Sequence, residues 1–297
     1  MNASSATKSK AFILMTASMF CFACMGTAIH GVQDMHITQM VFIRNVLSLG
    51  LMTAWFLWIH KGFTPLKTDK LKQHFFRSLV GVIGMHLWFA SLILLPLNTA
   101  MALSFTIPIF STILAGPMLG ERVGIRRWSA VIVGFLGVLV IIPPGMEIVD
   151  SGTIVALSAS MVIAITGIMI KSLTRTDHPV GIIYYMTIFM TLFSLPLAIY
   201  FWDDVSVQQF NIILLIAIFS MAAHMLMTRA FQMADLTTLM PIDYTRLIFT
   251  AILAYFFFSE VITINTIMGA AIIAGSGLYI ARREAMKHRK KPPINTA

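Results

Sequence analysis

The chain has 297 residues, of which 58% are hydrophobic and only 11% are charged, whereas a soluble domain carries about 25% charged residues. A soluble globule cannot bury so much apolar surface beneath a polar exterior, so these values exclude a soluble enzyme and a nucleic-acid-binding domain. Continuous apolar runs of about 20 residues also exclude the alternating pattern of a membrane β-barrel and indicate a helical protein that crosses the membrane many times.

Ten apolar segments follow one another along the sequence, separated by short connectors with polar or turn-forming residues. The connectors leave no room for a soluble domain. The sequence therefore predicts an all-α membrane protein with ten transmembrane helices. The predicted segments are 11–30, 38–59, 73–94, 98–118, 125–142, 152–171, 180–201, 209–230, 238–258 and 263–281.

The distribution of Lys and Arg predicts the orientation in the membrane. Of the 21 basic residues, 17 lie in the two termini and the even-numbered connectors, and the odd-numbered connectors contain none. Arg77 and Arg229 lie near segment ends on the same side as these 17. Basic residues are retained on the cytoplasmic side, so both termini are expected in the cytoplasm. The net charge of +9 thus indicates topology rather than nucleic-acid binding.

The second half of the chain repeats features of the first half. A shift of 139 residues places Glu121 on Glu260 and Ser104 on Asp243. Each glutamate follows the fourth segment of its half and precedes a segment rich in small residues, and each is expected to cap the N-terminus of the helix that follows it. Chance similarity between apolar stretches is the alternative explanation.

The repeat divides the chain into a first five-helix unit over 1–145 and a second over 150–285, followed by a basic cytoplasmic tail over 286–297. An odd number of segments in each half forces the two units into opposite orientations in the membrane. Inverted repeats of this kind are typical of secondary transporters, whose substrate site lies near the midplane between the repeats.

Several motifs resemble a known family. They are the Phe42-Ile43-Arg44 triplet, the run Ala102–Glu121 followed by Arg127-Trp128, and the run from Pro241-Ile242-Asp243-Tyr244-Thr245-Arg246 to Glu260. These motifs are similar to those of the drug/metabolite transporter superfamily, specifically its EamA-type bacterial members with ten spans. The resemblance implies an inner-membrane carrier that works by alternating access. Its relatives move amino acids, nucleotide-like metabolites, vitamins or metallophores in either direction.

Arg246 and Asp243 are the first candidates for a substrate site. An ionisable residue inside a bilayer costs about 2.5–3.5 kcal/mol on the insertion scale, so each one requires an explanation. The two residues are three positions apart and share a helix face near mid-depth, with Tyr244 between them in sequence. They are either a substrate-binding arginine oriented by an aspartate or a structural pair that neutralises itself.

Five further residues are candidates because their polar side chains lie inside predicted segments: Arg44, His86, Trp88, Ser104 and His224. Each also has a structural interpretation. Arg44 is near enough to a segment end to reach the outer surface. The histidines could bond a neighbouring helix, and the serine could bond its own helix backbone.

The remaining motifs are interpreted as packing features. Cys21 and Cys24 form a C-x-x-C pair without a nearby His, Asp or Glu, so redox or metal chemistry is not expected from them. The glycines at 134/137 and 275/277 allow helices to approach closely, and a contact between two copies of the chain is one use for them.

A secondary transporter for a small molecule that carries an anionic group, such as an amino acid or another carboxylate, is the function that the sequence favours. The spare donors of a mid-membrane arginine suit a carboxylate. A passive channel or facilitator and, last, an intramembrane enzyme are the alternatives. The sequence offers neither clustered catalytic groups nor a nucleotide-binding glycine-rich loop, so no cofactor, metal or catalytic residue is expected. The partners expected are the substrate, the lipid bilayer and a second copy of the chain.

Overall fold

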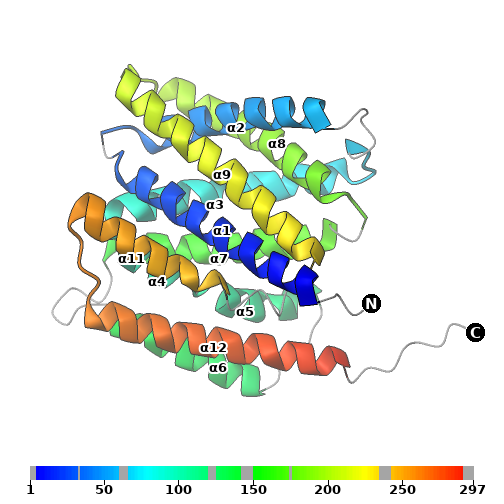
Figure 1. The fold of residues 1–297 in the computed structure, drawn as a ribbon, viewed down its shortest axis with the longest axis vertical. Helices are drawn as coiled ribbons and strands as arrows, with labels where there is room; N and C mark the ends of the chain where they lie inside the picture. The colour runs from blue at the N-terminus through cyan, green and yellow to red at the C-terminus, as the bar shows by residue number, and fades with distance from the viewer. Residues whose placement is uncertain are drawn as a thin grey trace, which may run out of the picture.

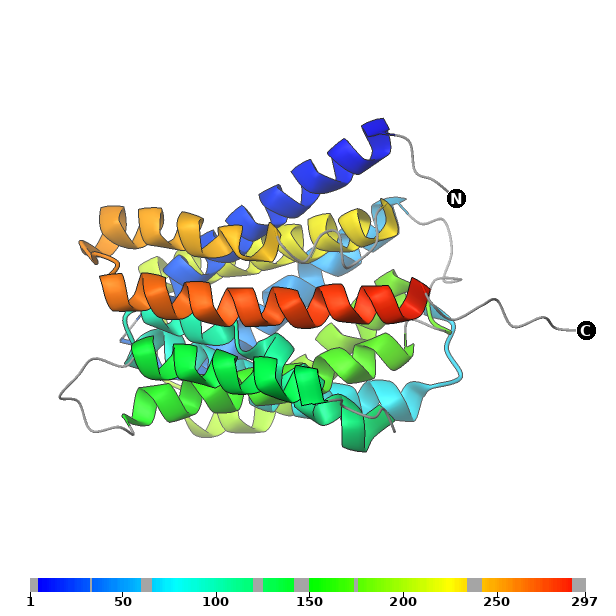
Figure 2. The same ribbon diagram turned by 90° about the horizontal axis from the view of Figure 1, so that it is seen from below.

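The fold is a bundle of α-helices whose axes run roughly along one direction (Figure 1 and Figure 2). The structure, a computed structural model, describes residues 5–32, 34–59, 66–119, 125–141, 150–173, 176–233 and 242–289, and no strand occurs within these ranges. The described helices are α1 Ser5–His30, α2 Ile37–Ile59, α3 Leu71–Leu94, α4 Leu97–Ser104, α5 Ile107–Leu119, α6 Ile125–Ile141, α7 Ser151–Leu173, α8 Pro179–Tyr200, α9 Val207–Met233, α11 Thr245–Phe258 and α12 Ile264–Arg289.

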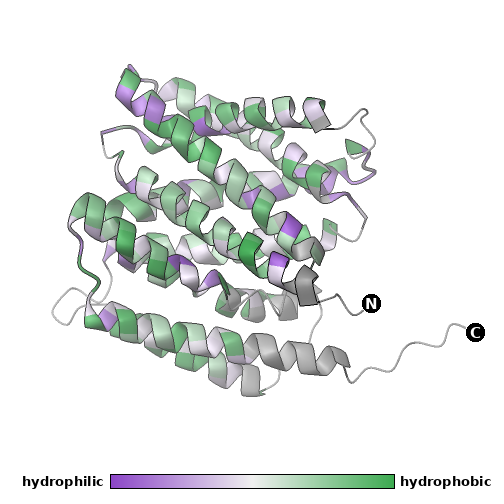
Figure 3. Cartoon of the chain, viewed as in Figure 1, coloured by the Kyte–Doolittle hydropathy of each residue, from purple (hydrophilic) through white to green (hydrophobic). Residues whose placement is uncertain are grey.

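The helices match the predicted segments closely. Six of the described helices, namely α1, α2, α3, α7, α8 and α9, are long and apolar enough to cross a membrane, and four shorter apolar stretches lie in the remaining helices. Hydrophobic residues cover most of the length of these helices (Figure 3). Large apolar side chains face outward, with Trp58 84% and Phe256 76% exposed, which suits a lipid environment and not water. The chain is an all-α polytopic membrane protein.

The fourth predicted segment, 98–118, differs from expectation because it is not one continuous helix. α4 ends at Ser104, a turn occupies Phe105 and Thr106, and α5 begins at Ile107. Pro108 has no amide hydrogen and therefore cannot bond to the Ser104 carbonyl four residues earlier, which explains why the helix is interrupted there. Nearly every residue of α4 is buried, so this short helix lies at the centre of the bundle.

Helices from the two halves of the chain pack against each other in pairs. α1 packs along α9 and α3 along α7, while α2 packs on α8 and α6 on α12. The counterparts α1 and α7 run in opposite directions along the bundle (Figure 1). The chain begins and ends at the same end of the bundle (Figure 2). We call this end the terminus end, and the opposite one the far end.

Close packing of α6 on α12 uses glycines within one chain. A Cβ at Gly269 would lie 2.5 Å from the carbonyl oxygen of Gly137, and a Cβ at Gly134 would meet an α5 side chain at 2.1 Å. A Cβ at Gly275, by contrast, would meet nothing within 4 Å. The glycines of α6 thus serve a contact inside the chain, and a contact between two copies stays a prediction.

Candidate functional site

The interrupted fourth span meets the start of α11 in the middle of the bundle. The rings of Phe105 and Tyr244 pack edge to face there, with centroids 4.9 Å apart and planes at 82°. Both residues lie at a turn that immediately precedes a helix, Phe105 before α5 and Tyr244 before α11. The shift of 139 residues that relates the two halves makes Phe105 and Tyr244 equivalent positions of the repeat. We call Ser104, Phe105, Asp243, Tyr244 and Arg246 the central site.

Arg246 joins the two halves at this site. Its Nη2 donates a hydrogen bond of 3.0 Å to the Ser104 Oγ, and its guanidinium carbon lies 5.9 Å from the centroid of the Phe105 ring. The contact to Asp243 is long, at 3.9 Å between Nη2 and Oδ2. The sequence predicted the pairing of Arg246 with Asp243, and the structure adds the bond to Ser104 in the other half.

The guanidinium of Arg246 has N–H groups that form no hydrogen bond with any described residue. Its side chain is only 15% exposed, and its buried Nε is one of these unpaired donors. A guanidinium has five donors, whereas Ser104 accepts one and Asp243 is too distant for a short hydrogen bond. These unused donors have the chemistry that suits an anionic group.

Arg44 and His224 lie near each other on α2 and α9, and no described hydrogen bond or ion pair joins them to the central site. The Arg44 guanidinium donates to the Ser220 Oγ of α9 and, at 2.8 Å, to the Asn45 Oδ1. The His224 Nδ1 lies 2.7 Å from the Ser220 carbonyl oxygen of its own helix. Arg44 is buried, with 5% exposure, so it does not reach the outer surface, and the lipid-interface interpretation is wrong.

A small cavity lies beside these residues between α2, α8 and α9. Its volume is about 30 Å³, which is room for a water molecule but not for a metabolite. The residues that line this α2–α8–α9 cavity are Arg44, Ser48, Met52, Ile183, Met186, Thr187, Ser220, Met221, His224 and Met225.

The two remaining candidates from the sequence are His86 and Trp88, and no described contact joins them to the central site or to Arg44. The Nδ1 of His86 lies 2.7 Å from the Val82 carbonyl oxygen of its own helix, and its buried Nε2 has no partner. Trp88 is half-buried and packs against the main hydrophobic core.

Sequence reasoning missed three residues, of which Phe105 lies at the central site and Ser220 lines the α2–α8–α9 cavity. Phe105 gave no signal because aromatic residues are common throughout the chain. Ser220 is one of many serines in apolar segments. Arg77 was interpreted as a residue at a segment end, yet it is only 7% exposed in α3, and its Nε and Nη1 have no partner. A count of basic residues can locate Arg77 in a segment but cannot show which face of the helix is buried.

At the far end of the bundle, Glu260 connects three segments. Its carboxylate accepts the Leu97 amide at 2.9 Å, which caps α4, and lies 3.1 Å from the Nε2 of His30 at the end of α1. The other ring nitrogen of His30 contacts the Leu92 carbonyl oxygen. The prediction that Glu260 caps the helix that follows it is wrong, because its carboxylate bonds the start of α4, while the Thr263 hydroxyl accepts the Thr266 amide in the first turn of α12. Glu121 lies outside the described residues.

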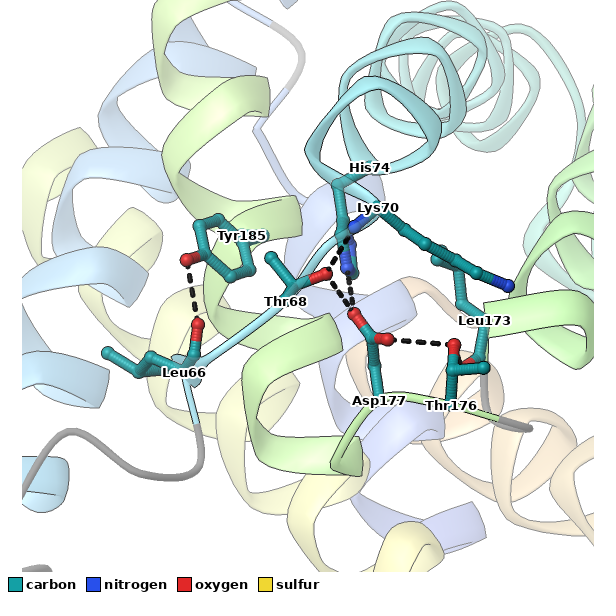
Figure 4. A network of polar contacts seen from close by, with 8 residues as sticks. All are labelled: Leu66, Thr68, Lys70, His74, Leu173, Thr176, Asp177 and Tyr185. Carbon is teal, nitrogen blue, oxygen red and sulfur yellow. Dashed lines mark hydrogen bonds and ion pairs between the residues drawn. The ribbon is translucent and has the colours of Figure 1, made fainter.

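At the terminus end, Asp177 occupies the centre of a polar network between two connectors (Figure 4). Its Oδ2 accepts from Thr68 at 2.5 Å and lies 2.7 Å from the Nε2 of His74, while its Oδ1 accepts from Thr176 at 2.8 Å. The Tyr185 hydroxyl donates to the Leu66 carbonyl oxygen at 2.8 Å, which adds a further tie between the same connectors.

Electrostatics favour the charged form of Asp177. Burial by itself would raise the pKa of this carboxyl, but the hydrogen bonds from Thr68, His74 and Thr176 outweigh burial and lower the pKa below its ordinary value. The network therefore ties the α2–α3 connector firmly to the α7–α8 connector. Each end of the bundle thus carries a contact between a carboxylate and a histidine.

Comparison with known proteins shows which proteins the chain resembles in sequence and in fold. The chain is 31% identical over 86% of its length to an S-adenosylmethionine uptake transporter of Rickettsia felis, covering 87% of that protein. It is 29% identical over 77% of its length to a riboflavin transporter of Vibrio cholerae, covering 78% of that protein. The fold is similar to a crystal structure with a TM-score of 0.64 at 14% identity, over 94% of this chain and 99% of the other.

These relatives support a small-metabolite transporter and not an enzyme. Residues 9–142 and residues 150–282 each match the EamA-like transporter family, so two copies of the family's unit account for nearly the whole chain. The chain belongs to the EamA-like transporter family.

Proposed function

We propose that the chain is a secondary active transporter that moves a small metabolite with a carboxylate group across the bacterial inner membrane. The observation that carries the proposal is the position of Arg246, which holds spare donors where the two halves meet and bonds to Ser104 across them. The planar fork of a guanidinium binds a carboxylate through two parallel hydrogen bonds, so a carboxylate is the group that it suits best.

The central site also suits a second charge on the same substrate. Asp243 is 38% exposed and lies 3.9 Å from Arg246, so its oxygens are available to a cationic group a short distance from the carboxylate. An α-amino acid places an ammonium and a carboxylate at such a separation. S-Adenosylmethionine is an amino-acid derivative and the named substrate of a relative, which makes it the first compound to test.

Alternating access is the mechanism that we propose for this movement. Contacts of Glu260 with His30 tie the far end together, and contacts of Asp177 with His74 tie the terminus end together. A carrier must open these ends one at a time. We treat residues 1–145 and 150–285 as inverted repeats, which the opposite directions of α1 and α7 support (Figure 1).

The orientation follows from the basic residues and remains part of the proposal. The terminus end is assigned to the cytoplasm, because the Lys-rich and Arg-rich connectors and the tail over 286–297 belong to that side. Reporter fusions after Asp204 should therefore read outside, and fusions after Lys70 should read inside. A cytoplasmic reading at Asp204 would contradict the orientation.

Uptake into proteoliposomes tests the function. Purified protein is reconstituted, and entry of labelled S-adenosylmethionine is measured with and without unlabelled compound inside the vesicles. A carrier shows saturable entry that internal compound stimulates, whereas a channel shows neither property. Excess unlabelled riboflavin serves as the competitor control. Entry of riboflavin but not of S-adenosylmethionine would overturn the carboxylate proposal, because riboflavin carries no carboxylate.

A further inference from the structure

The α2–α8–α9 cavity has the composition of a binding site in its own right. Arg44, Ser48 and Met52 are four residues apart along α2, so they present one face of that helix to the cavity. Ser220 and His224 contribute a polar face from α9. The cavity is thus polar on two sides although it lies inside an apolar bundle.

The buried guanidinium of Arg44 has no acidic partner among the described residues. The residue is 5% exposed, and no described atom forms a hydrogen bond with its Nε. Its bonds go to the neutral side chains of Asn45, Ser220 and Met85. An uncompensated charge in the membrane interior is costly, so a place beside Arg44 favours an anion.

Arg77 is a second buried arginine, but it does not line the cavity. It lies in α3, and two of its guanidinium nitrogens form no hydrogen bond with any described residue. By the helical rise, Arg44 lies about 10 Å from the far end of α2, whereas Arg77 lies about 9 Å from the terminus end of α3, so the two arginines lie at different depths in the bundle. The positive charge at the cavity therefore comes from Arg44.

The rest of the cavity wall consists of apolar, flexible side chains, most of them methionines. The thioethers of Met52, Met186, Met221 and Met225 line it. Methionine side chains are flexible and polarisable, so they can move apart for a flat or unbranched apolar group. The hydroxyl of Ser48 has no hydrogen-bond partner and lies on the same wall, where it can donate to an anionic oxygen.

We propose that the α2–α8–α9 cavity is a second binding site, which takes the carboxylate of an organic anion at Arg44 and its apolar part among the methionines. This site differs from the central site because Arg246 has Asp243 beside it, whereas Arg44 has only neutral partners among the described residues. The proposal does not depend on which compound the central site carries.

Charge-selective labelling tests the site. Cys21 and Cys24 are first replaced by alanine, and Ser48→Cys is then introduced, with Ser206→Cys in the exposed α8–α9 connector as the matched control. Each purified protein reacts with an anionic sulfonatoethyl or a cationic trimethylammonioethyl methanethiosulfonate. The anionic-to-cationic rate ratio should be at least about ten-fold higher for Ser48→Cys than for Ser206→Cys, and addition of Arg44→Gln should abolish most of that difference.

Protection from labelling tests the ligand class. We expect 3-phenylpropanoate to slow the reaction of Ser48→Cys and the neutral 3-phenylpropanamide to leave it unchanged. Protection should persist with Arg246→Gln and disappear with Arg44→Gln. Equal protection by the amide, loss of protection with Arg246→Gln, equal rate ratios at the two thiols, or an unreactive thiol in folded Ser48→Cys protein would each overturn the proposal.

The design separates this proposal from the transport proposal. None of the measurements uses transport, so they succeed or fail whatever the proteoliposomes show. Should Arg44→Gln fail to fold, the rate ratio and the selective protection in protein that retains Arg44 still decide the outcome.

Discussion

Phe105 and Tyr244 occupy equivalent positions in the two halves of the chain and touch each other, with ring centroids 4.9 Å apart. Each aromatic ring follows a polar residue that contacts or approaches Arg246, namely Ser104 at 3.0 Å and Asp243 at 3.9 Å. The contact therefore brings the turn before α5 against the turn before α11. A group bound by Arg246 would be in contact with both halves. Movement of one half relative to the other would therefore change the contacts of the bound substrate.

Arg246 is expected to act through its shape as well as its charge. Arg246→Lys keeps the charge but loses the fork and the bond to Ser104, so transport should fall at least ten-fold, nearly as far as with Arg246→Ala. Initial uptake rates in proteoliposomes measure this, with Arg229→Lys on the exposed end of α9 as the control. Wild-type uptake by the lysine variant would show that charge alone is sufficient. Loss of folded protein in both variants would instead favour a structural ion pair.

Asp243 is expected to influence the pH dependence of transport. It is the acid of the central site, its carboxylate lies 3.9 Å from Arg246, and its side chain is partly exposed. Asp243→Asn should fold normally and change the profile of uptake rate against pH, while Asp204→Asn in the exposed α8–α9 connector should not change it. An unchanged profile together with weaker binding would limit Asp243 to substrate contact.

Asp177 should stabilise the terminus end in a manner that depends on pH. Its lowered pKa means that the stabilisation is complete above about pH 4, the ordinary range of an aspartate, and is lost as pH falls through the lower pKa of the folded protein. Asp177→Asn should cost about 1–3 kcal/mol at pH 7, since bonds to a charged group are lost.

Thermal unfolding between pH 7 and pH 3 measures the effect of Asp177→Asn. The difference in midpoint from the wild type should shrink toward pH 3, and Asp204→Asn should show no such trend. A difference that stays constant across this range would mean that the charge of Asp177 is not what stabilises the network.

Glu260 should stabilise the far end through two separable contacts. Glu260→Gln retains an oxygen that can cap the Leu97 amide but loses the charge that faces His30, whereas Glu260→Ala loses both. The alanine variant should lose about 1–2 kcal/mol, the usual value of a cap, and the glutamine variant should lose less. Thermal midpoints of purified protein give the comparison. Equal losses would show that the contact with His30 matters and the cap does not.

Gly269 should tolerate no larger side chain. A Cβ at this position would lie 2.4 Å from an Ile141 side-chain carbon and 2.5 Å from the Gly137 carbonyl oxygen, so Gly269→Ala should force α6 and α12 apart. We expect a loss of about 1–3 kcal/mol in stability, in line with overpacked cores. Gly275→Ala in the same helix is the matched control, because its Cβ would meet nothing within 4 Å. A similar loss in both variants would contradict the packing explanation, and helix propensity could not account for it, because alanine favours a helix more than glycine does.

The sequence by itself determined the features that depend on the membrane as a solvent. A bilayer requires long apolar segments with satisfied backbones, so most helix ends could be located within a few residues from hydropathy alone. The exceptions include α1 and α12, which extend well beyond the predicted segments 11–30 and 263–281. Arg246 and Asp243 were found for the same reason, since a charge within such a segment is costly and conspicuous. The shift of 139 residues also predicted that Ser104 and Asp243 are equivalent.

Only the tertiary structure decided which of these residues meet. The bond from Arg246 to Ser104 joins residues 142 positions apart, and the cap from Glu260 to Leu97 joins residues 163 apart. Hydropathy and spacing describe one helix at a time, whereas such contacts depend on which helices pack together and at which register. Arg77 illustrates the limit: its place in the sequence indicated a segment end, but packing of the neighbouring helices buries it.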